Sequence, residues 1–258
     1  MIAASCLAIL YNGAAMPDLL LVPVLICVAV AVLAGVVRGF AGFGAAMILT
    51  PVFSAFYGPT VGVPVCLLVE FCISLPLLRK AWPLVDWRQI ATLLVAAAVG
   101  VPVGVWILAW ADPAPMRWAI SGIVLGAVLL LASGWRYTGK PVVAGTLSAG
   151  VASGFLNGLA GMAGPPVAFY YLAGAGAAAA IRASFIVYFA AVDLVALLGL
   201  TARGLMTLQA LLLAAIFVLP YIAGGLVGER LFKLASETFF RRLALVILAV
   251  VAVAAPFL

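Results

Sequence analysis

The chain has 258 residues, of which 68% are hydrophobic and 8% are charged. Soluble domains carry roughly 25% charged residues, so this composition excludes a soluble globular protein. Several long stretches carry few or no charges, and about 20 such residues are enough to cross the hydrocarbon core of a bilayer. The sequence therefore predicts an all-α integral membrane protein. Its net charge of +6 then concerns orientation in the membrane, and we expect no nucleic acid as a partner.

Metal and enzyme chemistry are disfavoured by the residue types present. The chain has no histidine, and its cysteines and carboxylates form no cluster at metal-ligand spacing. We therefore expect no metal and no other cofactor. Since no pairing of a nucleophile with a base can be argued, we do not expect an enzyme.

The chain begins with a leader and continues as apolar segments. Residues 1–18 lack the basic region of a signal peptide, and the native start is either Met1 or Met16. Two later segments, 41–58 and 163–175, are short for a spanning helix and rich in glycine or proline. The predicted segments in chain order are about 19–37, 41–58, 60–78, 89–110, 116–133, 142–162, 163–175, 183–201, 207–228 and 240–258.

The two short segments belong to an internal repeat. The stretch "AGVVRGFAGFGAAMILTPVF" from Ala34 aligns without gaps to "SGFLNGLAGMAGPPVAFYYL" from Ser153. In this alignment Gly35, Gly39 and Gly42 fall on Gly154, Gly158 and Gly161, and Arg38 falls on Asn157. The alignment predicts two halves, 19–133 and 142–258, joined by the connector 134–141.

The distribution of lysine and arginine predicts ten membrane crossings, because positive charges concentrate on the cytoplasmic side. If the two short segments cross, 11 basic residues face 2; if they do not, 7 face 6. Five crossings per half make the repeats inverted and place both termini outside the cytoplasm. The 11 residues are Arg38, Arg79, Lys80, Arg88, Arg136, Lys140, Arg182, Arg230, Lys233, Arg241 and Arg242.

The glycines and prolines of the two short segments predict broken helices that meet near the middle of the membrane. Glycine lets a backbone turn, and proline interrupts the hydrogen-bond ladder of a helix. Irregular backbone survives in a membrane only inside the protein or along a wet cavity. A helix that starts after such a break offers free N–H groups to an anion. The alternative is that the small residues only permit close helix packing.

The doubled glycine-rich segment resembles the sulfite exporter TauE/SafE family, also called the toluene sulfonate uptake permease family. The stretches "GFAGFGAAMILTPVF" and "GFLNGLAGMAGPPVAFYYL" look like its two signature segments. The likeness extends to "VDW" at 85–87, "GVPVGVWI" at 100–107, "IRASF" at 181–185, "GGLVGERLFK" and "FRR". The resemblance implies a secondary transporter for a small sulfur-containing anion, such as sulfite, thiosulfate or an organosulfonate, in a bacterial inner membrane.

Three ionisable residues lie deep in predicted membrane segments, where a charge costs about 2.5–3.5 kcal/mol at the centre of the bilayer. Arg38 precedes the first break and has the forked donors that suit an anion, unless it snorkels or pairs permanently with Glu70. Glu70 and Asp193 each lie in the middle of a span. Burial favours the neutral form of a carboxyl group, so both are candidates for proton coupling, the alternative being structural counter-ions.

These observations define a candidate substrate site and a function. We expect an alternating-access transporter that binds a small anion between the halves and is embedded in lipid, either as a monomer or as a homo-oligomer. The alternatives are a passive anion channel and a permease for a small carboxylate. The candidate substrate-binding residues are Arg38, Gly39, Gly42, Gly44, Asn157, Gly158, Gly161, Gly164, Arg182, Ser184 and Tyr170.

Overall fold

A computed structural model describes residues 17–133, 143–172, 178–232 and 237–257 of the chain. Within these ranges the protein consists of helices and their connections, without a strand. Six of the described helices are long and apolar enough to cross a membrane. The prediction of an all-α membrane protein is therefore confirmed, whereas the count of ten crossings stays a prediction. Most of the expected leader and the whole connector lie outside the described residues.

The helix boundaries follow capping and helix-breaking residues. The carboxylate of Asp86 accepts hydrogen bonds from the first backbone N–H groups of the helix that follows it, at 3.1 and 3.3 Å. The helices are α2 (Pro17–Ala41), α3 (Ala46–Tyr57), α4 (Pro59–Ala81), η1 (Trp82–Leu84), α5 (Trp87–Trp110), α6 (Pro113–Ala132), α7 (Val143–Ala160), α8 (Gly164–Leu172), α9 (Ala178–Ala202), α10 (Leu208–Phe232), α11 (Glu237–Ala254) and η2 (Ala255–Phe257).

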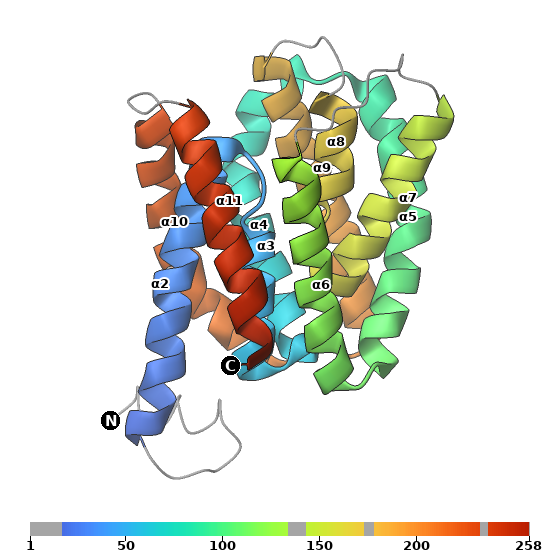
Figure 1. The fold of residues 1–258 in the computed structure, drawn as a ribbon. Coiled ribbons are helices and arrows are strands. Elements are labelled where there is room, and N and C mark those ends of the chain that lie inside the picture. The colour runs from blue at the N-terminus through green and yellow to red at the C-terminus, as the bar shows by residue number, and fades with distance from the viewer. Residues whose placement is uncertain (1–16, 134–142, 173–177, 233–236, 258) are drawn as a thin grey trace.

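The helices form one bundle in which helices far apart in the chain lie side by side (Figure 1). Helix α2 packs along α10, and α5 packs along α7. Helices α4 and α9 contact each other and are the most buried of the six candidate spans, with 56% of each apolar window buried. The interior of the bundle is therefore built around α4 and α9.

Glycines bring the paired helices into backbone contact. A Cβ atom on Gly35 of α2 would lie 2.2 Å from the carbonyl oxygen of Tyr221 in α10. A Cβ atom on Gly154 of α7 would lie 2.2 Å from the carbonyl oxygen of Ala97 in α5. No real Cβ atom tolerates such a distance to backbone. Both pairs therefore depend on small residues in the way that close-packed membrane helices do.

The outer surface of the bundle is apolar. Large aliphatic side chains such as Val95, Leu198, Leu219 and Val250 are more than half exposed. Extended apolar surface of this kind is rare on soluble monomers and is typical of a face that contacts lipid or a partner. The surface thus agrees with the apolar length of the helices in indicating a protein that crosses a membrane several times.

The first and last helix ends of the described chain lie at one end of the bundle, and the helix ends that flank the connector lie at the other (Figure 1). The start of α2 and the end of α11 lie at the lower end in Figure 1. The end of α6 and the start of α7, which flank the connector, lie at the upper end. The end of α4 carries Arg79 and Lys80 in its last turn and also lies at the upper end.

Candidate functional site

The first helix break separates α2 from α3. Helix α2 ends at Ala41, and the backbone N–H of Gly42 donates to the carbonyl of Arg38 at 2.8 Å. Gly42 and Gly44 have φ values of 81° and 93°, which side-chain-bearing residues rarely adopt. The glycines therefore allow the chain to leave α2 and start α3 at Ala46 within four residues. Arg38 lies in the last turn before this break.

The second break separates α7 from α8 and repeats part of this geometry. The backbone N–H of Gly161 donates to the carbonyl of Asn157 at 2.8 Å, and Gly161 has a φ of 69°. The carbonyl of Ala163 in the break accepts a hydrogen bond from the Ser153 hydroxyl at 2.7 Å. That hydroxyl in turn accepts one from the Tyr188 hydroxyl at 2.9 Å. The irregular backbone is thus held by side chains inside the protein.

Residues of both breaks line one small polar pocket. Its volume is about 20 Å³, which is room for about one water molecule. A sulfur oxyanion has at least four heavy atoms and is larger than this space. The lining residues are Arg38, Gly44, Ala46, Glu70, Asn157, Gly161, Ala163, Gly164, Phe189 and Asp193.

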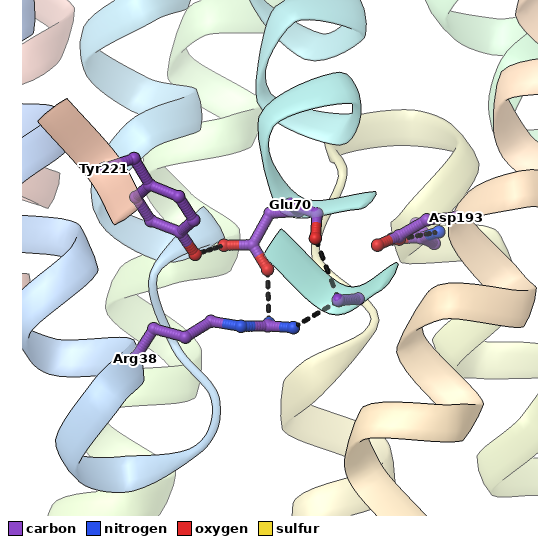
Figure 2. A network of polar contacts seen from close by, with 6 residues as sticks. Arg38, Glu70, Asp193 and Tyr221 are labelled. Atoms are coloured by element: carbon purple, nitrogen blue, oxygen red, sulfur yellow. Dashed lines mark hydrogen bonds and ion pairs between the residues drawn. The ribbon is translucent and has the colours of Figure 1, made fainter. Parts of the chain in front are cut away.

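Arg38 lines this pocket and contacts two polar side chains of α4 (Figure 2). One of its terminal nitrogens, Nη1, forms an ion pair with Oε2 of Glu70, and Nη2 donates to the Ser74 hydroxyl at 2.9 Å. The guanidinium carbon lies 5.6 Å from the ring centroid of Phe189, a cation–π distance. Arg38 is 7% exposed and Glu70 is 4% exposed, so the pair is buried. Arg38 therefore contacts Glu70 and does not snorkel to the membrane surface.

Glu70 has a second donor that the sequence analysis missed. The Tyr221 hydroxyl of α10 donates to Oε1 of Glu70, so each carboxylate oxygen has a donor of its own (Figure 2). Tyr221 is fully buried. The signal for it was available, since a tyrosine in the middle of an apolar span needs a hydrogen-bond partner. The identity of that partner depends on which helices are neighbours.

A second polar pair lines the same pocket. The Asn157 side-chain nitrogen of α7 donates to Oδ1 of Asp193 in α9 at 3.0 Å. Both residues are buried, and the side-chain oxygen of Asn157 has no hydrogen-bond partner in the described part of the protein. Asp193 stands apart from the cluster around Glu70 in Figure 2. The pocket therefore contains one unsatisfied polar acceptor and two acidic side chains.

The remaining candidate residues lie outside the pocket lining. Gly39 and Gly158 lie in helix contacts, where a Cβ atom would be 2.1 Å and 2.3 Å from the carbonyl oxygens of Gly225 and Val101. Arg182 of α9 donates to the Gly39 carbonyl at 3.1 Å.

The last two candidate residues are Ser184 and Tyr170. Ser184 is buried within α9. The side chain of Tyr170 lies outside the described residues. Of the eleven candidates, five line the pocket, namely Arg38, Gly44, Asn157, Gly161 and Gly164.

An apolar helical bundle with charged and amide side chains around a buried pocket defines a polytopic membrane protein with an internal polar site. The model of the sulfite exporter TauE/SafE family matches residues 27–255, which is most of the chain. The protein therefore belongs to this family of membrane transporters for sulfur anions. No curated protein and no solved structure gives a significant match to the chain.

Proposed function

We propose that the protein moves a small sulfur-containing anion across the bacterial inner membrane by alternating access. The observation that carries this proposal is the pocket shared by the two breaks, since helix breaks that meet inside a membrane protein are a recurrent feature of transporter substrate sites. Family membership supplies the class of substrate. The volume of about 20 Å³ fits a closed state that must open to admit the anion.

The packing of the helices supports two inverted halves. The gap-free alignment pairs α2 with α7 and α3 with α8, so that α4, α5 and α6 correspond to α9, α10 and α11. Under this pairing the contact of α2 with α10 corresponds to that of α7 with α5, and both occur. The bonds Arg38–Ser74 and Asn157–Asp193 also correspond and have lengths of 2.9 and 3.0 Å. Rocking of one half against the other would expose the pocket to alternate sides.

Two features of the pocket suit an anion. Arg38 offers a planar group with several N–H donors, which matches the oxygens of a sulfur oxyanion. The first turns of α3 and α8 begin at the breaks, and helix N-termini carry partial positive charge. Glu70 and Asp193 lie beside the same pocket and are the proposed sites of proton coupling.

The proposed orientation places both termini in the periplasm and the connector 134–141 in the cytoplasm. The start of α2 and the end of α11 lie at one end of the bundle, opposite the helix ends that flank the connector (Figure 1). The basic last turns of α4 and α10 also favour the connector side as cytoplasmic.

The test is a binding screen followed by transport in liposomes. Purified protein is heated with sulfite, thiosulfate, sulfoacetate, taurine or a small carboxylate, and a ligand of the native state raises the midpoint of unfolding. We expect stabilisation by sulfur anions, and accumulation of the same anion in proteoliposomes when a proton gradient is imposed. Stabilisation by carboxylates alone would favour a carboxylate permease. Flux that never exceeds equilibrium under any gradient would favour a passive channel.

A further inference from the structure

The Glu70 carboxylate already pairs with Arg38, the residue that is proposed to bind the substrate anion. The Nη1 and Nη2 groups of Arg38 are both engaged, by Glu70 and by the Ser74 hydroxyl. An anion that arrives at Arg38 therefore meets another anion already in place. Two negative charges on one buried guanidinium within a low-dielectric site repel each other strongly. The substrate must displace Glu70 or wait until Glu70 is neutral.

We propose that Glu70 is an intramolecular ligand of the anion site, held there by Tyr221, and that the substrate binds Arg38 only when Glu70 has taken up a proton. This inference rests on the proposed function and specifies how its site is regulated. One proton from the aqueous phase is taken up for each anion bound, and Arg38 stays charged throughout. Without a substrate, the Glu70 carboxylate neutralises the charge of Arg38.

Charged and titratable side chains from four helices lie around Glu70. Helix α2 contributes Arg38, α10 contributes Tyr221, α9 contributes Asp193, and α4 itself contributes Cys66 one turn earlier. Helix α3 carries no charged side chain. Asp193 is a second acidic group near Glu70. Its presence makes it still less favourable for a charged Glu70 and an incoming anion to occupy the pocket together. Arg38 is the cation that the three negative groups share.

Tyr221 reaches Glu70 from a helix that is locked to the helix of Arg38. A Cβ atom on Gly224 or Gly228 of α10 would lie 2.1 or 2.2 Å from carbonyl oxygens of α2, so the two helices are in backbone contact. Arg38 and Tyr221 therefore approach Glu70 from one close-packed helix pair, whereas Glu70 is carried by α4. A shift of α4 relative to this pair breaks both bonds together. Tyr221 is thus a positioning residue for Glu70.

The first experiment uses the wild-type protein and thiosulfate, which remains a dianion over the range studied. Thiosulfate is added to purified protein in weakly buffered solution, and proton uptake is followed with a pH indicator. The dissociation constant is measured from about pH 5 to pH 8. We expect proton uptake on binding and a loss of affinity of about tenfold per pH unit above the midpoint. If binding neither takes up nor releases protons and is equally strong at every pH, the proposed replacement of Glu70 by the substrate at Arg38 is overturned.

Two variants assign the effect to its residues. Glu70→Gln cannot hold the exchanged proton, so its affinity for thiosulfate should lose most of its change with pH, and Asp193 remains as the only acidic side chain in the described pocket lining. Tyr221→Phe removes a donor to the charged carboxylate, so binding should persist to a pH about one to two units higher. Tyr188→Phe is the matched control, because Tyr188 is an equally buried tyrosine that donates to Ser153. It should leave the pH midpoint of binding unchanged.

The outcomes separate the exchange from the function on which it rests. If Tyr221→Phe weakens binding equally at every pH, Tyr221 contacts the substrate or only stabilises the fold, and its positioning role is overturned. If Glu70→Gln retains the pH dependence, the proton is held elsewhere, and the exchange at Glu70 is overturned. If the wild-type protein binds none of sulfite, thiosulfate, sulfoacetate and taurine at any pH, the proposed function itself is overturned.

Discussion

Replacing Arg38 with alanine leaves the Glu70 carboxylate, which is only 4% exposed, without its cation. Removal of one partner of a buried ion pair costs about 3–5 kcal/mol. Tyr221 still donates to Glu70 in this variant, so we expect a loss of free energy of unfolding near the lower end, about 3 kcal/mol.

The double variant Arg38→Ala with Glu70→Gln removes the stranded charge. The remaining costs are the lost contact of Arg38 with Phe189, worth about 1 kcal/mol, the lost hydrogen bond to Ser74 and some packing. The double variant should therefore regain about 1–2 kcal/mol of stability relative to Arg38→Ala. Because Arg38 is also the proposed anion ligand, the double variant should fold and still fail to bind thiosulfate.

Equilibrium unfolding in mixed micelles measures the stability, and calorimetry with thiosulfate measures the affinity. The matched control is Arg182→Ala, alone and with Glu70→Gln, because Arg182 donates to the Gly39 carbonyl. Its effect should add to that of Glu70→Gln without coupling. If the double variant binds thiosulfate as tightly as the parent, Arg38 is only a counter-ion. If it is no more stable than Arg38→Ala, the stranded-charge argument is wrong.

Three further predictions test the packing, the breaks and the topology. Gly154→Ala should destabilise the protein by about 1–3 kcal/mol through overpacking, whereas Gly122→Ala in open space should not; equal shifts in unfolding temperature would contradict this packing. Gly161→Val should abolish transport, whereas Gly204→Val at a similar φ of 70° should retain it, as liposome flux assays can show. A cysteine introduced in the connector 134–141 should react with a membrane-impermeant reagent only after permeabilisation; labelling of intact cells would refute the orientation.

Composition and the placement of charges determined the class of protein without reference to tertiary structure. Apolar length and scarcity of charge leave only a helical membrane protein, because backbone groups in lipid must be satisfied within each helix. The same logic directed attention to Arg38, Glu70 and Asp193, since an ionisable group in a span is costly and requires a partner or a function. All three line the pocket.

The roles of individual glycines were decided by tertiary structure. Gly39 and Gly44 lie five positions apart in the same glycine-rich stretch and look equivalent in the sequence. Gly39 faces the backbone of α10, whereas Gly44 lines the pocket with a φ of 93°. Composition permits both a helix contact and a backbone turn, and only the position of the neighbouring helix separates them.

The hydrogen-bond partner of Tyr221 was likewise decided by tertiary structure and could not be read from the sequence. Its partner Glu70 lies 151 positions earlier in the chain, on a helix of the other predicted half. The apolar pattern of each span predicts a helix, but every span in such a protein is apolar on most faces, so periodicity does not identify its neighbours. The neighbours follow from where glycines let α2 and α10 touch. That contact, made only in the folded protein, brings Arg38 and Tyr221 to the two oxygens of Glu70.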